Sequence, residues 1–123
     1  MIFNKYLFIK KDDEKMNLII LIGRISNEFN LKYLPGTGTP VGEFDIAVTR
    51  KSTSKENQKT DFFTIQIWGK YAEVLSDKLA KGRLVSVKGY GQIDKWKDEN
   101  NNTYSKFKVI SKDVKSLDYI SSN

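Results

Sequence analysis

The fold of this chain is decided by residues 60–82, TDFFTIQIWGKYAEVLSDKLAKG. Up to Trp68 the side chains alternate, with Phe63, Ile65 and Ile67 on one face, and this period of two predicts a strand over 61–68. After Trp68 the apolar positions recur at helical spacing until Gly82, which predicts a helix over 69–81 that ends at the glycine.

Four further strands flank this segment. They are predicted over 17–25, 41–51, 83–96 and 104–116, separated by a turn over 34–40, a polar loop over 52–60 and a hairpin tip over 97–103. The order is strand, strand, strand, helix, strand, strand. We therefore expect an all-β fold with one helix, the five-stranded OB barrel, whose strand face and loops bind oligonucleotides or oligosaccharides. Other small β-barrels share this order.

Composition excludes much chemistry. The 123 residues include no cysteine and no histidine, so thiolate and imidazole catalysis, disulfides and standard zinc sites are ruled out. We expect no catalytic residue, no metal and no cofactor. The formal net charge is +6, and only Arg24, Arg50 and Arg83 among the 21 basic residues are arginines. An excess made mostly of lysine favours delocalised attraction to a polyanion over reading of base edges, although a solubilising surface would look the same.

The chain divides into three parts. Residues 1–15 are predicted to form an N-terminal extension, since the charged run 10–15 separates them from the rest and Met16 could be the natural start. Residues 16–118 form one domain, and 119–123 a short tail. The longest apolar run, 18–22, is too short to span a bilayer, and no signal-peptide pattern is present, so we expect a cytoplasmic protein with no membrane partner.

Strand alternation places aromatic rings on one wet face. Phe62 and Trp68 bracket polar residues on one strand, and Tyr90 and Trp96 alternate with polar residues on the next. Tyr104 joins them from the last strand with Lys106 and Lys108, while Ile93 and Phe107 are assigned to the core with Val85, Val87 and Val109. Rings interleaved with lysines suit single-stranded nucleic acid, because bases stack and phosphates attract cations. The alternative is that these rings fill a subunit interface or lie under a loop, and a bulge at Gly89 or Gly91 would reverse the side on which Trp96 lies.

Several motifs carry a family resemblance. NLIILIGRI over 17–25, LKYLP over 31–35, FDIAV over 44–48, WGKYAE over 68–73, LAKG over 79–82 and VKG over 87–89 occur in one order along the chain. Over about residues 16–118 the sequence resembles the bacterial single-stranded DNA-binding protein family.

The resemblance implies an OB fold assembled as a homotetramer, or a dimer, through the first strand, which we expect to be buried on both faces. It puts stacking residues at Phe62, Trp68 and Trp96, and basic contacts at Lys32, Lys70, Lys81 and Lys95. One family aromatic is missing near Ser52, and Asp94 stands where a basic residue is common. The chain resembles a short form without the acidic C-terminal tail, so recruitment of replication enzymes by the usual acidic tip is not expected.

Sequence-independent binding and protection of single-stranded DNA, in replication, recombination or repair, is the predicted function. The predicted DNA-binding residues are Phe62, Trp68, Tyr90, Trp96, Tyr104, Lys32, Arg50, Lys51, Lys70, Lys81, Lys95, Lys106 and Lys108. An RNA-binding or replication-accessory OB module is the nearest alternative. A nuclease that holds Mg²⁺ on Asp45, Asp61 and Asp94 is a weaker one, because spacing brings no two of them together.

Overall fold

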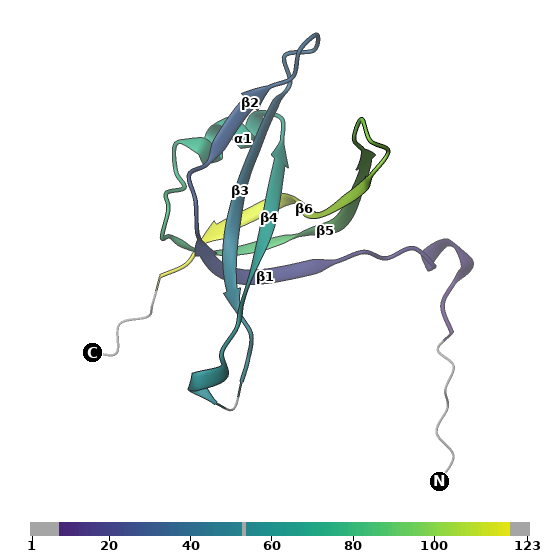
Figure 1. Ribbon diagram of the computed structural model, residues 1–123. Helices are drawn as coiled ribbons and strands as arrows, with labels where there is room; N and C mark the ends of the chain where they lie inside the picture. The colour runs from purple at the N-terminus through teal and green to yellow at the C-terminus, as the bar shows by residue number, and fades with distance from the viewer. Residues whose placement is uncertain (1–7, 53, 119–123) are drawn as a thin grey trace.

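The computed structural model describes residues 8–52 and 54–118. The predicted tail over 119–123 and the first seven residues of the predicted extension lie outside the described residues. The strands are β1 (Ile19–Ile25), β2 (Asn30–Tyr33), β3 (Pro40–Thr49), β4 (Thr60–Trp68), β5 (Leu84–Lys97) and β6 (Thr103–Ser116), with helix α1 (Lys70–Ser76) after β4 (Figure 1). Two short 3-10 helices cover Lys11–Asp13 and Lys55–Asn57.

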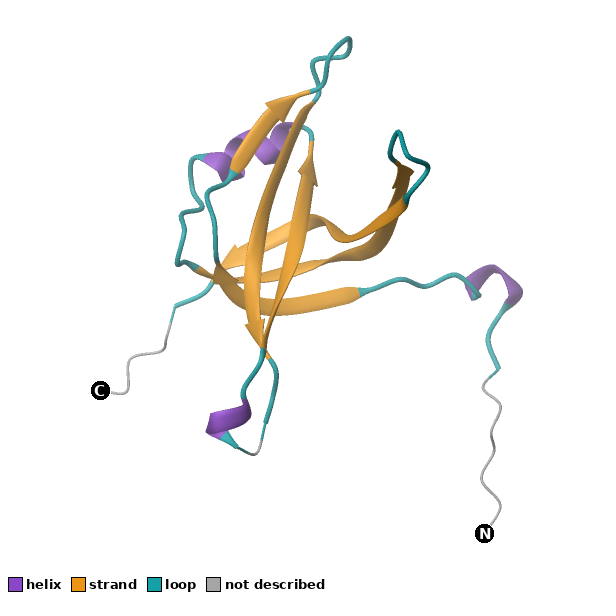
Figure 2. Cartoon of the chain, viewed as in Figure 1, coloured by secondary structure: helices purple, strands orange, loops and turns teal. Residues whose placement is uncertain are grey.

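Five of the strands close into a ring. The sheet order is β1-β5-β6-β4-β3-β2, and β1 also pairs with β3, so β1, β5, β6, β4 and β3 enclose the core. This confirms the OB fold with one helix. Strand β2 was not predicted as a strand, since its four residues show no clear alternation. It pairs with the first four residues of β3. Helix α1 packs on β2, β3 and β4 at one end of the ring (Figure 2).

A glycine allows the ring to close. Strand β1 pairs with β5 through Ile19–Arg24 and with β3 through Arg24 and Ile25, so it crosses from one partner to the other near Gly23. A Cβ atom on Gly23 would collide with the carbonyl oxygen of Ala47 on β3. Only a residue without a side chain lets the two backbones come this close.

The core follows the alternation of the strands, with two corrections. Val85, Val87 and Val109 are fully buried, as predicted. Ile93 and Phe107 were predicted in the core, and this was wrong: they are 61% and 42% exposed. Both lie where β5 and β6 extend past the ring of strands as a two-stranded arm (Figure 1), although the Phe107 ring still packs edge-on against Phe63, with centroids 6.4 Å apart.

One further prediction needs correction and another is not tested by a single chain. Ile20 and Ile22 are 61% and 56% exposed here, so burial of the first strand on both faces, expected together with assembly through it, stays a prediction. The helix is shorter than predicted and ends at Ser76, although Leu79 remains buried and its N–H still bonds the Leu75 carbonyl oxygen at 2.9 Å. The helical spacing of Leu79 therefore came from a turn that packs on the core. Within residues 8–52 and 54–118, no helix has the length and apolar content needed to cross a membrane.

Candidate nucleic-acid interface

Exposed aromatic side chains line one side of the closed ring of strands and of the arm formed by β5 and β6. The five predicted stacking residues are between 44% and 66% exposed: Phe62, Trp68, Tyr90, Trp96 and Tyr104. Large rings left in water at five places on three neighbouring strands form a surface that can take flat apolar ligands. The predicted exposure of these rings is confirmed, and their contact with DNA stays a prediction.

The side on which Trp96 lies depends on a bulge, which falls on β6. Lys88 pairs with Asp113 and Gly89 with Ser111, so the extra residue is Lys112 and the alternation of β5 continues unbroken. Trp96 therefore stays on the same face as Tyr90. It lies opposite Tyr104, and the two rings stack with centroids 5.8 Å apart and planes 19° apart.

The hairpin tip holds the Tyr104 ring in place. Its hydroxyl donates to Asp98 Oδ2 at 2.9 Å, and Asp98 Oδ1 accepts the backbone N–H groups of Asn100 and Asn102 at 2.9 Å each. The bonds from Asn102, followed by that from Tyr104, lower the pKa of Asp98. The stacked pair of rings is thus anchored to the turn that joins β5 and β6.

Three adjoining hollows make a groove across this face. One, of about 200 Å³, lies between β2, β3 and β4 and is lined by Lys32, Glu43 and Trp68. A second, of about 280 Å³, lies between Trp68 and Tyr90 and includes Lys112. A third, of about 150 Å³, lies beside Glu43 and includes Lys106. Trp68 borders the first two hollows and Glu43 borders the first and the third, so the three adjoin one another along this face.

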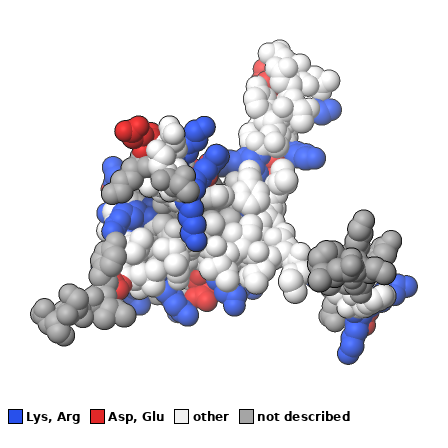
Figure 3. Space-filling model, turned by 90° about the horizontal axis from the view of Figure 1, so that it is seen from below, with Lys and Arg blue, Asp and Glu red and all other residues white. Residues whose placement is uncertain are grey.

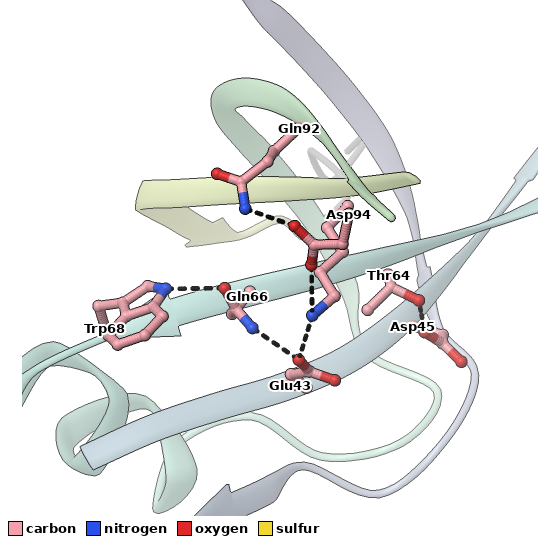
Figure 4. A network of polar contacts seen from close by, with 8 residues as sticks. Glu43, Asp45, Thr64, Gln66, Trp68, Gln92 and Asp94 are labelled. Carbon is pink, nitrogen blue, oxygen red and sulfur yellow. Dashed lines mark hydrogen bonds and ion pairs between the residues drawn. The ribbon is translucent and has the colours of Figure 1, made fainter. Parts of the chain in front are cut away.

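A chain of hydrogen bonds fixes the floor of this groove (Figure 4). The Trp68 indole N–H donates to Gln66 Oε1 at 2.7 Å, and Gln66 Nε2 donates to Glu43 Oε2 at 2.7 Å. Thr64 donates to Asp45 Oδ1 at 2.8 Å on the same floor. Thr64 and Gln66 were predicted on a wet surface, but they are only 9% and 7% exposed. Their hydrogen bonds to Asp45, Glu43 and Trp68 hold both side chains in the floor of the groove, where little of them contacts water.

Lys108 belongs to this network. Its ammonium nitrogen lies 3.0 Å from Asp94 Oδ2 and 3.4 Å from Glu43 Oε2, and its side chain is only 18% exposed. Burial acts to lower the pKa of Lys108, but the two carboxylates outweigh it and raise the pKa. The Gln92 amide, and then Lys108, lower the pKa of Asp94. The sequence predicted a free cation at position 108, whereas the structure gives this charge two internal partners.

The other predicted cations lie in different surroundings. Lys32 and Lys106 border the groove and are exposed. Arg50 instead pairs with Asp61 at 2.8 and 3.0 Å, and this hydrogen bond lowers the pKa of Asp61. Lys95 alternates with Trp96 and so lies on the opposite face of β5.

The remaining three predicted cations lie in other parts of the chain. Lys51 follows β3, Lys70 begins α1, and both are exposed. Lys81 borders a separate hollow of about 360 Å³ with Arg24 and Arg83. The sequence analysis missed Asn30, Glu43, Gln66 and Lys112, which the register between strands brings into the groove.

The three aspartates of the nuclease alternative have different partners. Asp45 bonds Thr64 and Asn27, Asp61 bonds Arg50, and Asp94 bonds Gln92 and Lys108. In the described part of the chain, no three acidic, histidine or cysteine side chains are grouped closely enough to hold a metal ion.

Comparison with known proteins agrees with this geometry. A model described as the single-strand binding protein family matches residues 16–117. The chain belongs to this family. Over 108 residues it is 35% identical to single-stranded DNA-binding protein 3 of Clostridium acetobutylicum, covering 88% of this chain and 75% of the relative. Over 107 residues it is 36% identical to single-stranded DNA-binding protein 1 of Synechocystis, covering 87% and 85%.

A solved structure of the family gives the same result. The chain is similar to the Plasmodium falciparum SSB in its complex with ssDNA, with a TM-score of 0.74 and 31% identity over 86% of this chain and 98% of that one. The family resemblance read from the sequence motifs is confirmed.

Proposed function

We propose that this protein binds and protects single-stranded DNA without sequence specificity, as a non-catalytic factor in replication, recombination or repair. The observation that carries the proposal is the row of exposed rings on β4, β5 and β6 beside a groove bordered by Lys32, Lys106 and Lys112. Ring stacking on bases supplies about 1–3 kcal/mol per base whatever the sequence, and the cations attract phosphates. The proposal implies a location where single-stranded DNA forms, the cytoplasm and its nucleoid.

Duplex DNA fits this surface less well. A duplex presents phosphates but hides the faces of its bases, so exposed tryptophans would gain little from it. RNA is the closer competitor, because its bases can stack on the same rings and only the 2′-hydroxyl distinguishes it. Titration with DNA and RNA oligomers of the same sequence separates the two, and tighter binding of RNA would favour the alternative.

Assembly through β1 is part of the proposal. Ile20 and Ile22 lie on the outer face of this strand and Leu18 lies just before it, and each of the three is more than half exposed. Figure 3, seen from the side of β1, shows a broad area without charged residues, with basic and some acidic residues at its edges. A self-complementary apolar strand face of this kind suits a two-fold pair, and two pairs would give the tetramer that family resemblance implies.

Tryptophan fluorescence tests the binding directly. The chain has two tryptophans, and both Trp68 and Trp96 lie on the proposed surface. Adding oligo-dT should quench the emission strongly, and affinity should fall steeply with salt. Single Trp68→Phe and Trp96→Phe variants report the two positions separately. Unchanged emission at saturating oligomer would refute the proposal.

A further inference from the structure

The hairpin tip between β5 and β6 closes around one carboxylate. Asp98 Oδ1 accepts the backbone N–H groups of Asn100 and Asn102 at 2.9 Å each. Asp98 Oδ2 accepts the Asn102 side-chain amide at 3.1 Å and the Tyr104 hydroxyl at 2.9 Å. The Asp98 backbone N–H also donates to the Asn102 carbonyl oxygen at 3.0 Å. Asp98 therefore ties the turn to the start of β6.

The tyrosine that Asp98 holds belongs to the stacking surface. Tyr104 lies directly opposite Trp96 on the arm of β5 and β6 (Figure 1), and the two rings stack with centroids 5.8 Å apart. The two side chains are 44% and 49% exposed, so burial alone holds neither of them. The bond to Asp98 fixes the hydroxyl end of Tyr104, and a fixed Tyr104 ring limits the orientations of the Trp96 ring stacked on it.

The charge of Asp98 works against binding of a polyanion. All the donors to its carboxylate are uncharged, whereas Asp94 on β5 has the ammonium group of Lys108 at 3.0 Å. A carboxylate whose partners carry no charge repels phosphate groups. The favourable contribution of Asp98 is order, because a ring that is already oriented loses less conformational freedom when a base stacks on it.

We propose that Asp98 is a positioning residue for single-stranded DNA, which holds Tyr104 against Trp96 so that the two rings meet a base as one preformed platform. The inference rests on the proposed binding of single-stranded DNA. Asp98 acts through Tyr104 and does not itself touch the DNA. Removal of its side chain therefore weakens binding, even though it also removes a repelling charge.

Titration with oligo-dT in a Trp68→Phe background tests this role, because Trp96 is then the only tryptophan. Asp98→Ala should raise the dissociation constant about two- to tenfold, the range for ordering one side chain on binding. Tyr104→Phe keeps the ring and the other three bonds to Asp98, so it should weaken binding in the same direction with the turn intact. Adding Tyr104→Phe to Asp98→Ala should cause no further loss, since both changes remove the same bond.

Glu99→Ala is the matched control, since it removes the same charge from an exposed position on the same tip. It should bind oligo-dT at least as tightly as the background protein. Asp98→Asn also loses the charge, but it keeps an oxygen for the turn and an N–H group for the Tyr104 oxygen, so it should bind more tightly than Asp98→Ala. The near-ultraviolet circular dichroism of the stacked rings should change in Asp98→Ala and stay unchanged in Glu99→Ala.

The possible results separate this role from DNA binding itself. If Asp98→Ala binds as tightly as Glu99→Ala, the positioning role is overturned and single-stranded DNA binding stands. Equal affinities of Asp98→Asn and Asp98→Ala would overturn it as well. If oligo-dT quenches the wild type but not the Trp68→Phe background, Trp96 takes no base and only the positioning role fails. If oligo-dT does not quench the wild type, single-stranded DNA binding fails, and the positioning role fails with it.

Discussion

Replacing Lys108 by methionine removes the positive charge that faces Glu43 and Asp94 while keeping most of the side-chain volume. Exposed ion pairs contribute about 0.2–1 kcal/mol, and breaking a fully buried pair costs about 3–5 kcal/mol. Lys108 is 18% exposed and both carboxylates 35%, so this site lies between the two cases. We therefore expect Lys108→Met to lower the free energy of unfolding by roughly 1–3 kcal/mol.

Urea unfolding followed by circular dichroism measures this loss, at one fixed protomer concentration because assembly would add to stability. The control is Lys106→Met, which removes the same charge from an exposed position on the same strand and should change the free energy of unfolding by less than about 0.5 kcal/mol. Adding Asp94→Asn to Lys108→Met should recover part of the loss, since one unpaired carboxylate is then neutral.

Salt dependence of DNA binding separates a structural lysine from a phosphate contact. Each phosphate contact to a single strand contributes about 0.7 to the slope of log affinity against log salt. Lys106→Met should lower the slope by about that amount, and Lys108→Met should leave it unchanged. The reasoning is refuted if Lys108→Met is as stable as the wild type and its slope falls by about 0.7.

Three further predictions address the rings, the assembly and the response to acid. Trp96→Ala should weaken binding of oligo-dT by about 1–3 kcal/mol in a fluorescence titration, and Tyr104→Phe, which keeps the stacked ring but loses the bond to Asp98, should weaken it less. Ile22→Asp places a charge on the outer face of β1 and should shift sedimentation towards the monomer; an unchanged sedimentation coefficient would argue against assembly through this strand. Because the pKa values of Asp61 and Asp98 are lowered on folding, their contribution to stability is complete above the ordinary value of 3.8 and is lost as pH falls below it. Urea midpoints should drop over this range, and Asp98→Asn should show a smaller drop.

The fold could be predicted from local sequence because each element has its own period. Alternation over 61–68 predicted β4. It also placed Phe62 and Trp68 correctly on the exposed face of that strand, since successive side chains on a strand point to opposite faces. Strand β2 was missed because four residues are too few to show a period. Ile93 and Phe107 were misplaced because their alternation is regular, yet whether an apolar face is covered depends on what packs against it.

The candidate site was only half predictable for the same reason. Stacking needs an exposed ring, and exposure on one face can be read from one strand. The role of a lysine depends on its neighbours across strands, which no single strand specifies. Lys106 and Lys108 look alike in the sequence, but Lys108 lies opposite Thr64 on parallel β4, within reach of the carboxylate of Glu43.

The sequence by itself determined the five ring strands, the helix that follows β4, the family and the face on which the aromatic rings lie. These depend on short-range patterns that the backbone repeats every two or 3.6 residues. The tertiary structure alone decided which polar groups meet. Glu43, Gln66 and Lys108 come from β3, β4 and β6, and the pairing of β4 with both β3 and β6 sets the register that joins them. Because that register is a long-range property, no single strand could predict that Lys108 has two carboxylate partners.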